Sequence, residues 1–107
     1  MMQQIPLRQL PSQSFQIILD GQYCTITLYW KQKQLYLDLL VGNEPVIVGH
    51  ICQNRANILQ SPNYKFRGTL HFWDTRGDRP PAWGELDTRY ILLFLSEGEE
   101  IPEALRY

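Results

Sequence analysis

Side chains alternate between apolar and polar with a period of two through residues 14–41, and this pattern limits the folds open to the chain. A period of two is typical of β-strands that bury one face. The dipeptide Asp20-Gly21 interrupts the pattern and favours a two-residue hairpin turn, because that turn requires positive φ at both central positions. The sequence therefore predicts an antiparallel meander whose strands are residues 14–19, 22–30 and 35–41.

The second of these strands has two chemically different faces. One face is expected to enter the core, and it carries Cys24, Ile26, Leu28 and Trp30. The other face carries Tyr23, Thr25, Thr27 and Tyr29. Thr and Tyr favour strands and present both apolar and polar atoms, so this second face suits either solvent or a partner protein. We therefore take Tyr23 and Tyr29 as candidate partner-binding residues.

Further strands are expected at residues 46–48, 66–73 and 90–95. Residues 90–95 are apolar on both faces, which predicts a central place in a sheet. Gly68 inside a strand pattern predicts a bulge or a close backbone approach. Helix is limited to a predicted turn at residues 54–59 and a short terminal helix that begins at Pro102. The whole pattern predicts an all-β fold, a small antiparallel β-sandwich or barrel-like domain of about six strands.

Length and composition indicate one domain spanning residues 1–107. Hydrophobic residues make up 44% of the chain and charged residues 20%, which is too apolar for disorder. Residues 1–13 contain two prolines and are expected to form an N-terminal arm or an edge strand, because proline cannot donate a ladder hydrogen bond. Residues 97–107 read as an acidic C-terminal tail. The longest apolar run is far shorter than the ~20 residues of a membrane helix, and no secretion signal is recognised, so we expect no membrane partner.

Side chains that support catalysis or metal binding are sparse. The chain contains two Cys and two His, without the close spacings that zinc sites use, so we expect no metal and no cofactor. His50 and Cys52 come nearest to a reactive pair, and they give a small hydrolase as one hypothesis. No nucleophile motif accompanies them, so the residues favour a protein without enzyme activity and without a small-molecule substrate.

A local group of basic and aromatic residues supports an alternative function. Lys65, Arg67, His71 and Trp73 fall in one predicted β region, with Arg76 and Arg79 in the adjoining loop. Small β-barrels bind single-stranded nucleic acid through such groups, so the Lys65/Arg67/Trp73 face is a candidate nucleic-acid interface. The net charge of −1 and the acids interleaved nearby favour a solvated face or a protein interface instead.

Residues 74–87 form a long connection that carries Trp83 after two prolines. Connections of this length are usually functional or mobile. A Trp in such a segment either fills the core of its own domain or anchors a partner, because a large exposed aromatic side chain otherwise promotes aggregation. Trp73 and Trp83 therefore join Tyr23 and Tyr29 as candidate partner-binding residues.

Taken in order, the segments of the chain resemble one protein family. They read Ile5-Pro-Leu7, Phe15…Leu19-Asp-Gly-Gln22, Ile26-Thr-Leu-Tyr-Trp30, Tyr36-Leu-Asp-Leu39, Pro45-Val-Ile-Val-Gly49, Ala56-Asn-Ile-Leu59, Phe66-Arg-Gly-Thr-Leu70 and Thr88-Arg-Tyr-Ile-Leu-Leu93. Their order and spacing resemble the baseplate plug protein family of contractile-tailed phages, known from cyanophage-type virions and from prophages. The resemblance covers about residues 4–95.

This resemblance implies a small all-β structural protein at the axis of the tail baseplate, near the central hub where the tube meets the spike. It implies contacts with hub, spike, tube or wedge subunits and with copies of the chain itself. It also implies no enzyme activity and no cofactor, and a place in the virion after assembly in the host cytoplasm. The chain departs from the family pattern at Glu85-Leu-Asp87, where the family leads us to expect a Gly-containing turn, and in the acidic tail after Glu97.

Overall fold

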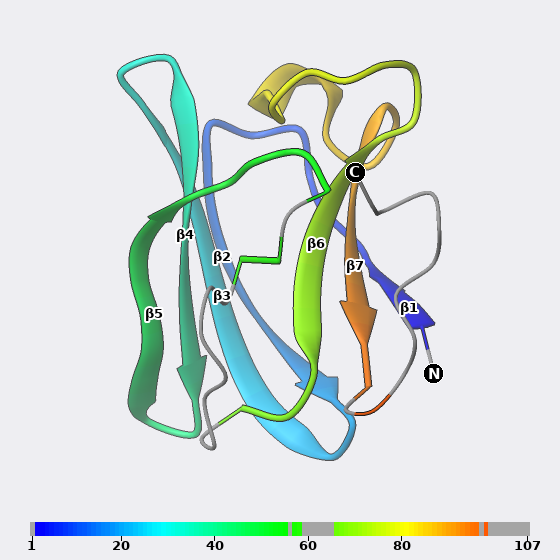
Figure 1. Ribbon diagram of the computed structural model, residues 1–107. Helices are drawn as coiled ribbons and strands as arrows, with labels where there is room; N and C mark the ends of the chain where they lie inside the picture. Colours follow the sequence, from blue (N-terminus) through cyan, green and yellow to red (C-terminus); the bar gives the residue numbers. More distant parts are fainter. Residues whose placement is uncertain (1, 56, 59–65, 97, 99–107) are drawn as a thin grey trace.

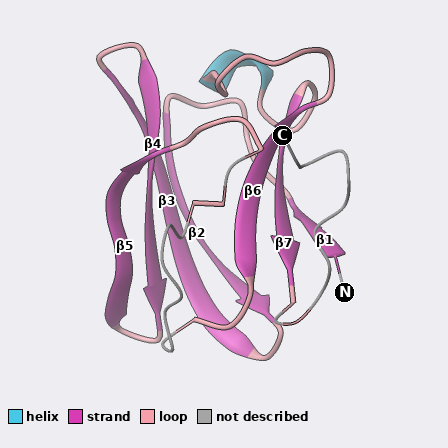
Figure 2. Ribbon diagram, viewed as in Figure 1, coloured by secondary structure: helices cyan, strands magenta, loops and turns pink. Residues whose placement is uncertain are grey.

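Two antiparallel sheets pack face to face in the computed structural model, which describes residues 2–55, 57–58, 66–96 and 98 (Figures 1 and 2). The three-stranded sheet has the order β1 (Met2–Ile5), β7 (Tyr90–Leu95), β6 (Thr69–Asp74). The four-stranded sheet has the order β2 (Ser12–Leu19), β3 (Gln22–Lys31), β4 (Gln34–Val41), β5 (Glu44–Ile51). The helical structure among the described residues is the short 3-10 turn η1 (Trp83–Glu85). The prediction of a small all-β sandwich is confirmed.

The four-stranded sheet is a meander of consecutive hairpins. Asp20 and Gly21 adopt φ values of 51° and 74°, and their turn sets Leu19 opposite Gln22. The next turn also places both central residues at positive φ, at Gln32 and Lys33. Two-residue turns of this kind match the twist of the strands that they join. The order β2, β3, β4, β5 with antiparallel pairing confirms the predicted meander.

Strand β5 is longer than the predicted residues 46–48. Pro45 and Gly49 argue against a continuous strand, yet both lie inside β5. The register with β4 shifts twice along this pairing, and Gly49 adopts a φ of 63°. These irregularities let β5 continue past residues that a regular strand excludes.

The core lies between the two sheets and contains the inward side chains of both. From the four-stranded sheet it includes Leu19, Cys24, Ile26, Leu28, Leu35, Leu37 and Leu39. From the three-stranded sheet it includes Ile5, Leu70, Phe72, Leu92 and Phe94. Each of these side chains is at most 1% exposed, so the alternation in the sequence identifies the buried face of each strand.

The three-stranded sheet joins the two ends of the described chain. Strand β7 lies between β1 and β6, which confirms the central place predicted from its apolar faces. Strand β1 is an edge strand at residues 2–5, and it ends before Pro6 because proline cannot donate to the ladder. The acidic segment 97–107 lies outside the described residues except for Gly98, and so does the terminal helix expected from Pro102.

Gly68 makes a close backbone approach, one of the two alternatives that the sequence predicted. Its φ is 114°, and a Cβ there would lie 2.5 Å from Cε1 of Phe94 and would also meet the carbonyl oxygen of Leu95. Strand β6 begins only after this residue, at Thr69, so the prediction of a strand from residue 66 was too long.

The helical turn predicted at residues 54–59 is wrong for the part of that segment that the structure describes. Asn54 forms a parallel bridge with Phe72, and Asn57 forms an antiparallel bridge with His71. The segment therefore lies along the outer edge of β6. No helix among the described residues has the length and apolar character needed to cross a membrane.

Candidate interaction surface

The four-stranded sheet has an outer face that points away from the core. We define this outer face by ten residues on its first three strands: Ser14, Gln16, Ile18, Tyr23, Thr25, Thr27, Tyr29, Tyr36, Asp38 and Leu40. Tyr23 and Ile18 are register partners, and they are 68% and 52% exposed. Strand β3 therefore buries one row of side chains and presents the other, including Tyr23 and Tyr29, on the outer face.

Polar contacts hold the centre of the outer face in place. The hydroxyl of Tyr29 donates to Oδ1 of Asp38 at 3.3 Å, and the backbone N–H of Gly49 donates to the same oxygen at 2.6 Å. The rings of Tyr29 and Tyr36 stack with their centroids 5.7 Å apart. Burial raises the pKa of Tyr29, and the Asp38 carboxylate raises it further, so this hydroxyl stays protonated at neutral pH. Tyr29 is thus a fixed part of the surface.

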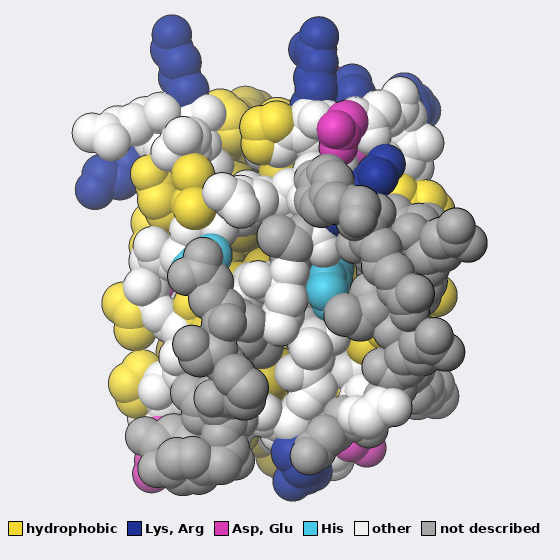
Figure 3. Space-filling view, in the orientation of Figure 1, with side chains coloured by type: hydrophobic (Ala, Val, Ile, Leu, Met, Phe, Trp, Pro, Cys, Tyr) yellow, Lys and Arg dark blue, Asp and Glu magenta, His cyan; other side chains and the backbone are white. Residues whose placement is uncertain are grey.

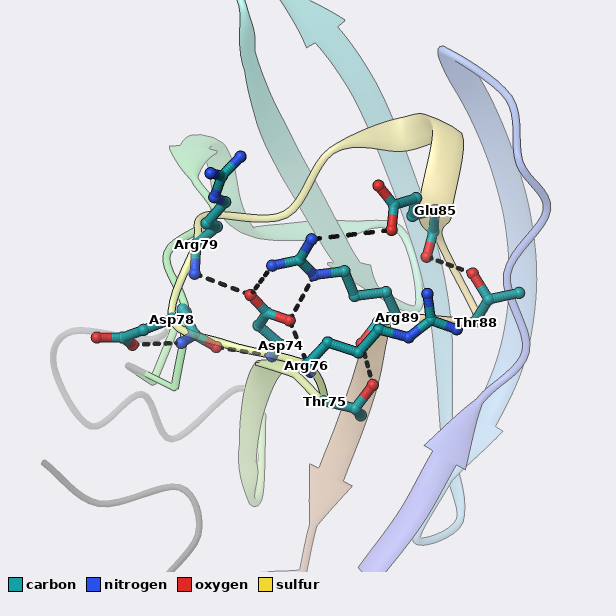
Figure 4. Close-up of polar contacts among 9 residues, drawn as sticks. Asp74, Thr75, Arg76, Asp78, Arg79, Glu85, Thr88 and Arg89 are labelled. Atoms are coloured by element: carbon teal, nitrogen blue, oxygen red, sulfur yellow. Dashed lines mark hydrogen bonds and ion pairs between the residues drawn. The ribbon is translucent and has the colours of Figure 1, made fainter.

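A buried carboxylate organises the long loop between β6 and β7 (Figure 4). Asp74 lies at the end of β6 and accepts hydrogen bonds from Nε and Nη2 of Arg89 at 2.7 and 2.9 Å. The backbone N–H groups of Arg76 and Arg79 also donate to it, each at 2.9 Å. Its side chain is 0% exposed. We call this set of contacts the Asp74 clasp.

The clasp fixes the ionisation of its members. Hydrogen bonds from Arg89 hold the pKa of Asp74 well below its usual range, and the N–H groups of Arg79 and Arg76 act in the same direction against the effect of burial. The Asp74 carboxylate in turn raises the pKa of Arg89. The guanidinium also lies 5.1 Å from the ring centroid of Tyr90. Residues 74–89 are therefore held at both ends by one charged contact.

Asp87 lies in the turn where the resemblance led us to expect a glycine. It adopts a φ of 65°, in the left-handed region where glycine is the usual residue. Its carboxylate accepts a hydrogen bond from the side chain of Gln4 at 3.1 Å. Asp tolerates this conformation better than most residues, so the turn keeps its shape without a glycine.

The two candidate Trp residues lie apart from the two Tyr residues. Trp73 is half-buried and packs with Ile91, Leu93 and Leu95, which point away from the main core. Trp83 lies in η1 and packs, half-buried, against the main core. The structure therefore does not gather the four predicted residues into one site. Only Tyr23 and Tyr29 share a surface.

The predicted basic and aromatic group does not form one face. His71 is 2% exposed, and its ring nitrogens contact the carbonyl of Arg55 at 2.7 Å and the hydroxyl of Thr69 at 3.0 Å. Burial lowers the pKa of His71, which favours its neutral form. Lys65 lies outside the described residues. The idea of a solvated strand face that includes His71 is therefore wrong.

The remaining cations of that group are divided between the two ends of β6. Arg67 precedes the strand and donates to the carbonyl of Asp20 at 3.0 Å, whereas Arg76 and Arg79 follow it in the clasped loop. A six-residue strand spans roughly 20 Å, which separates these ends. Figure 3 shows Lys and Arg side chains projecting from the upper end of the sandwich and others at its lower end. The geometry gives no support to the Lys65/Arg67/Trp73 face as one interface.

The hypothesis of a reactive His50–Cys52 pair also fails on geometry. Cys52 follows the end of β5, is 2% exposed, and burial raises the pKa of its thiol well above the ordinary value. Nδ1 of His50 instead contacts the carbonyl of Ile51 at 2.7 Å. A nucleophilic cysteine needs an accessible thiolate, which this environment disfavours. No group of three or more possible metal ligands gathers among the residues that the structure describes.

Among the described residues, the fold defines a small β-sandwich protein whose four-stranded sheet presents a regular, partly exposed outer face. The sequence matches, over residues 2–97, the family model described as "Cyanophage baseplate Pam3 plug gp18". No curated protein matches the sequence. The chain belongs to this family of phage baseplate plug proteins, as the order of its motifs indicated, and it is a structural component of the tail baseplate of a virion.

Proposed function

We propose that this protein packs near the central hub of the baseplate, where the tube meets the spike, and acts through protein–protein contacts. Its partners in this proposal are hub, spike, tube or wedge subunits and copies of itself, joined during assembly in the host cytoplasm. The observation that carries the proposal is the outer face of the four-stranded sheet, where Tyr23 is 68% exposed. Family membership supports a baseplate partner.

The chemistry of the outer face supports contact with protein. Of its ten defining residues, Asp38 alone is charged, and its carboxylate already accepts hydrogen bonds from Tyr29 and Gly49. Interface cores are depleted in charged residues and enriched in Tyr. Tyr23 and Ile18 would supply the apolar area, and the Thr and Ser hydroxyls beside them would supply hydrogen bonds. The surface thus resembles the centre of an interface rather than a solvated sheet.

Co-expression tests this proposal. The protein is produced with each hub, spike, tube and wedge protein of the same virion, and complexes are separated by size-exclusion chromatography. We expect a stable complex that Tyr23→Ala weakens about tenfold or more, as truncation of an aromatic anchor does. Gln53→Ala, which changes an exposed side chain away from the outer face, is the control. A monomer that binds none of these proteins would refute the proposal.

Trp73 and Trp83 form the second part of the proposal. Both indoles are half-buried, so each leaves part of its surface for a neighbour in the baseplate. If they anchor partners, Trp73→Leu and Trp83→Leu weaken the complex while the melting temperature of the isolated protein stays nearly unchanged. If the two variants only lower the melting temperature, these side chains serve their own domain.

A further inference from the structure

Within the part of the chain that the structure describes, the edge of β2 lacks the features by which soluble proteins protect exposed strand edges. Natural edge strands are short, carry charges or proline, contain bulges, or are covered by another segment. Strand β2 is eight residues long, keeps an unbroken register with β3, and reads Ser-Gln-Ser-Phe-Gln-Ile-Ile-Leu without a charge or a proline. Among the described residues, no segment pairs with its outer edge.

The other three edges of the sandwich are protected. Strand β5 contains Pro45 and two register shifts. Strand β6 is bridged by Asn54 and Asn57. Strand β1 has only four residues. The long, regular edge of β2 is therefore the exception in this molecule.

The hairpin geometry identifies which backbone groups point outward from β2. The two-residue turn at Asp20-Gly21 makes Leu19 and Gln22 the first hydrogen-bonded pair of the ladder. In an antiparallel ladder such pairs alternate, so every second residue directs its N–H and C=O away from the partner strand. On β2 these are Ser12, Ser14, Gln16 and Ile18. Their backbone groups form a row that can accept a further strand.

A groove of about 460 Å³ runs along this edge. Its walls include Leu7 and Leu10 from the loop after β1, and Phe15 and Ile17 from β2. Phe15 and Ile17 point toward the core but are only half-buried, whereas three of their four register partners on β3 and β4, Cys24, Ile26 and Leu39, are fully buried. Leu10 is 41% exposed. A strand added at this edge would bury these side chains with its own inward residues.

We propose that the edge of β2 receives an extended segment from another baseplate protein as an added β-strand. The backbone row would supply the hydrogen bonds, and the groove would take apolar side chains at alternate positions of the segment. A second copy of β2 fits less well, because its inward Phe15 and Ile17 already pack in part against their own core and would fill the groove incompletely. The occupant is therefore a terminal arm or linker that has no sheet of its own. This inference rests on the proposed function for the identity of the partner, but it uses the backbone edge of β2 and the groove beside it, whereas the proposed function uses the side chains of the outer face.

A model peptide tests the proposal directly. The probe is fluorescein-labelled Lys-Val-Thr-Val-Thr-Val-Thr-Val-Lys, which presents Val to one side and Thr to the other. We expect saturable binding in fluorescence anisotropy, together with slower amide exchange at Ser14, Gln16 and Ile18. Gln16→Pro removes an outward N–H and no bond to β3, so it is expected to weaken binding at least tenfold. Gln16→Ala keeps the N–H and is the matched control, expected to bind within about twofold of the original protein.

Three results would overturn the proposal. They are absence of peptide binding at millimolar concentration, equal binding by Gln16→Pro and Gln16→Ala, and sedimentation of the protein alone as a dimer that Gln16→Pro dissociates. If Gln16→Pro does not fold, Ser14→Pro with Ser14→Ala provides a second matched pair. Amide exchange of the unaltered protein is a further test, because peptide that binds without slowing exchange at Ser14, Gln16 and Ile18 would contradict the proposal. Tyr23→Ala should leave peptide binding unchanged, so failure of the outer-face proposal and failure of this one can be told apart.

Discussion

The Asp74 clasp makes a specific prediction for Asp74→Asn. The substitution keeps the shape of the side chain but removes its charge and replaces one accepting oxygen by an NH₂ donor. Two of the four hydrogen bonds that Asp74 accepts are lost, and the new donor faces groups that are themselves donors. Hydrogen bonds to a buried charged group contribute about 1.5–3 kcal/mol each. Partial access of water to Arg89, whose side chain is 18% exposed, places the loss toward the lower end, at about 3 kcal/mol.

A loss of this size is measurable by thermal unfolding at pH 7. For a domain of this length, about 3 kcal/mol lowers the melting temperature by about 12 °C. Asp78→Asn is the control, since Asp78 lies in the same loop but is exposed and accepts one side-chain hydrogen bond, from Asn54 at 2.7 Å. We expect Asp78→Asn to cost less than about 1 kcal/mol.

The dependence on pH tests the cause. The pKa of Asp74 is lowered on folding, so its ionised form stabilises the fold at every pH above the unfolded value of about 4. This contribution is lost as the pH falls from there toward the folded pKa. The difference in melting temperature between the original protein and Asp74→Asn should therefore shrink between pH 4.5 and pH 2. A difference in melting temperature that stays constant over this range would refute the reasoning. So would a loss of unfolding free energy below about 1 kcal/mol at pH 7.

Three further predictions concern the sandwich itself. Gly68→Ala should destabilise the fold by at least about 2 kcal/mol in urea unfolding, because its Cβ meets backbone and its φ is positive, whereas Gly84→Ala, with open space around it, should stay within about 0.5 kcal/mol. Cys24 and Cys52 should not react with a thiol reagent at pH 8 until denaturant is added, since burial raises both pKa values; rapid labelling of the native protein would contradict this. Gly21→Ala should cost about 1 kcal/mol in the same urea assay, through backbone conformation alone, and an unchanged midpoint would show that the turn tolerates Ala at a φ of 74°.

The parts of the fold that sequence predicts well are those decided by local chemistry. Asp20-Gly21 specifies its turn because few other dipeptides adopt two successive positive φ values, and the alternation beside it identifies the buried face. The central place of β7 follows from apolar residues on both of its faces. In each case the information lies within about ten residues of chain.

The parts that sequence misses depend on contacts between distant segments. Strand β5 continues through Gly49 because the carboxylate of Asp38, on the neighbouring strand, accepts its N–H. Asn54 and Asn57 bridge to β6 although their own segment favours a helical turn. The Asp74 clasp was also missed, although opposite charges at the two ends of one loop were visible in the sequence as Asp74 and Arg89.

The candidate surface shows the same division. Alternation correctly separated Tyr23 and Tyr29 from the core, because that depends on one strand. It could not show that Trp73 lies on the outer side of the other sheet or that Trp83 packs against the core. Alternation also could not predict the open edge of β2, since whether a strand lies at an edge depends on the order of all strands in the sheet.

The pairing of β1 with β7 sets the order in which the protein can form during synthesis. Strands β2 to β5 pair only with neighbours in the sequence, so their sheet can form once Ile51 has left the ribosome. Strand β1, although made first, has no partner until Leu95 appears. At roughly 5–20 residues per second, translation of residues 52–95 takes roughly 2–9 s. During that interval the inner face of the four-stranded sheet lacks the complete second sheet that covers it. Strand β1 is the first strand to be made and the last to pair.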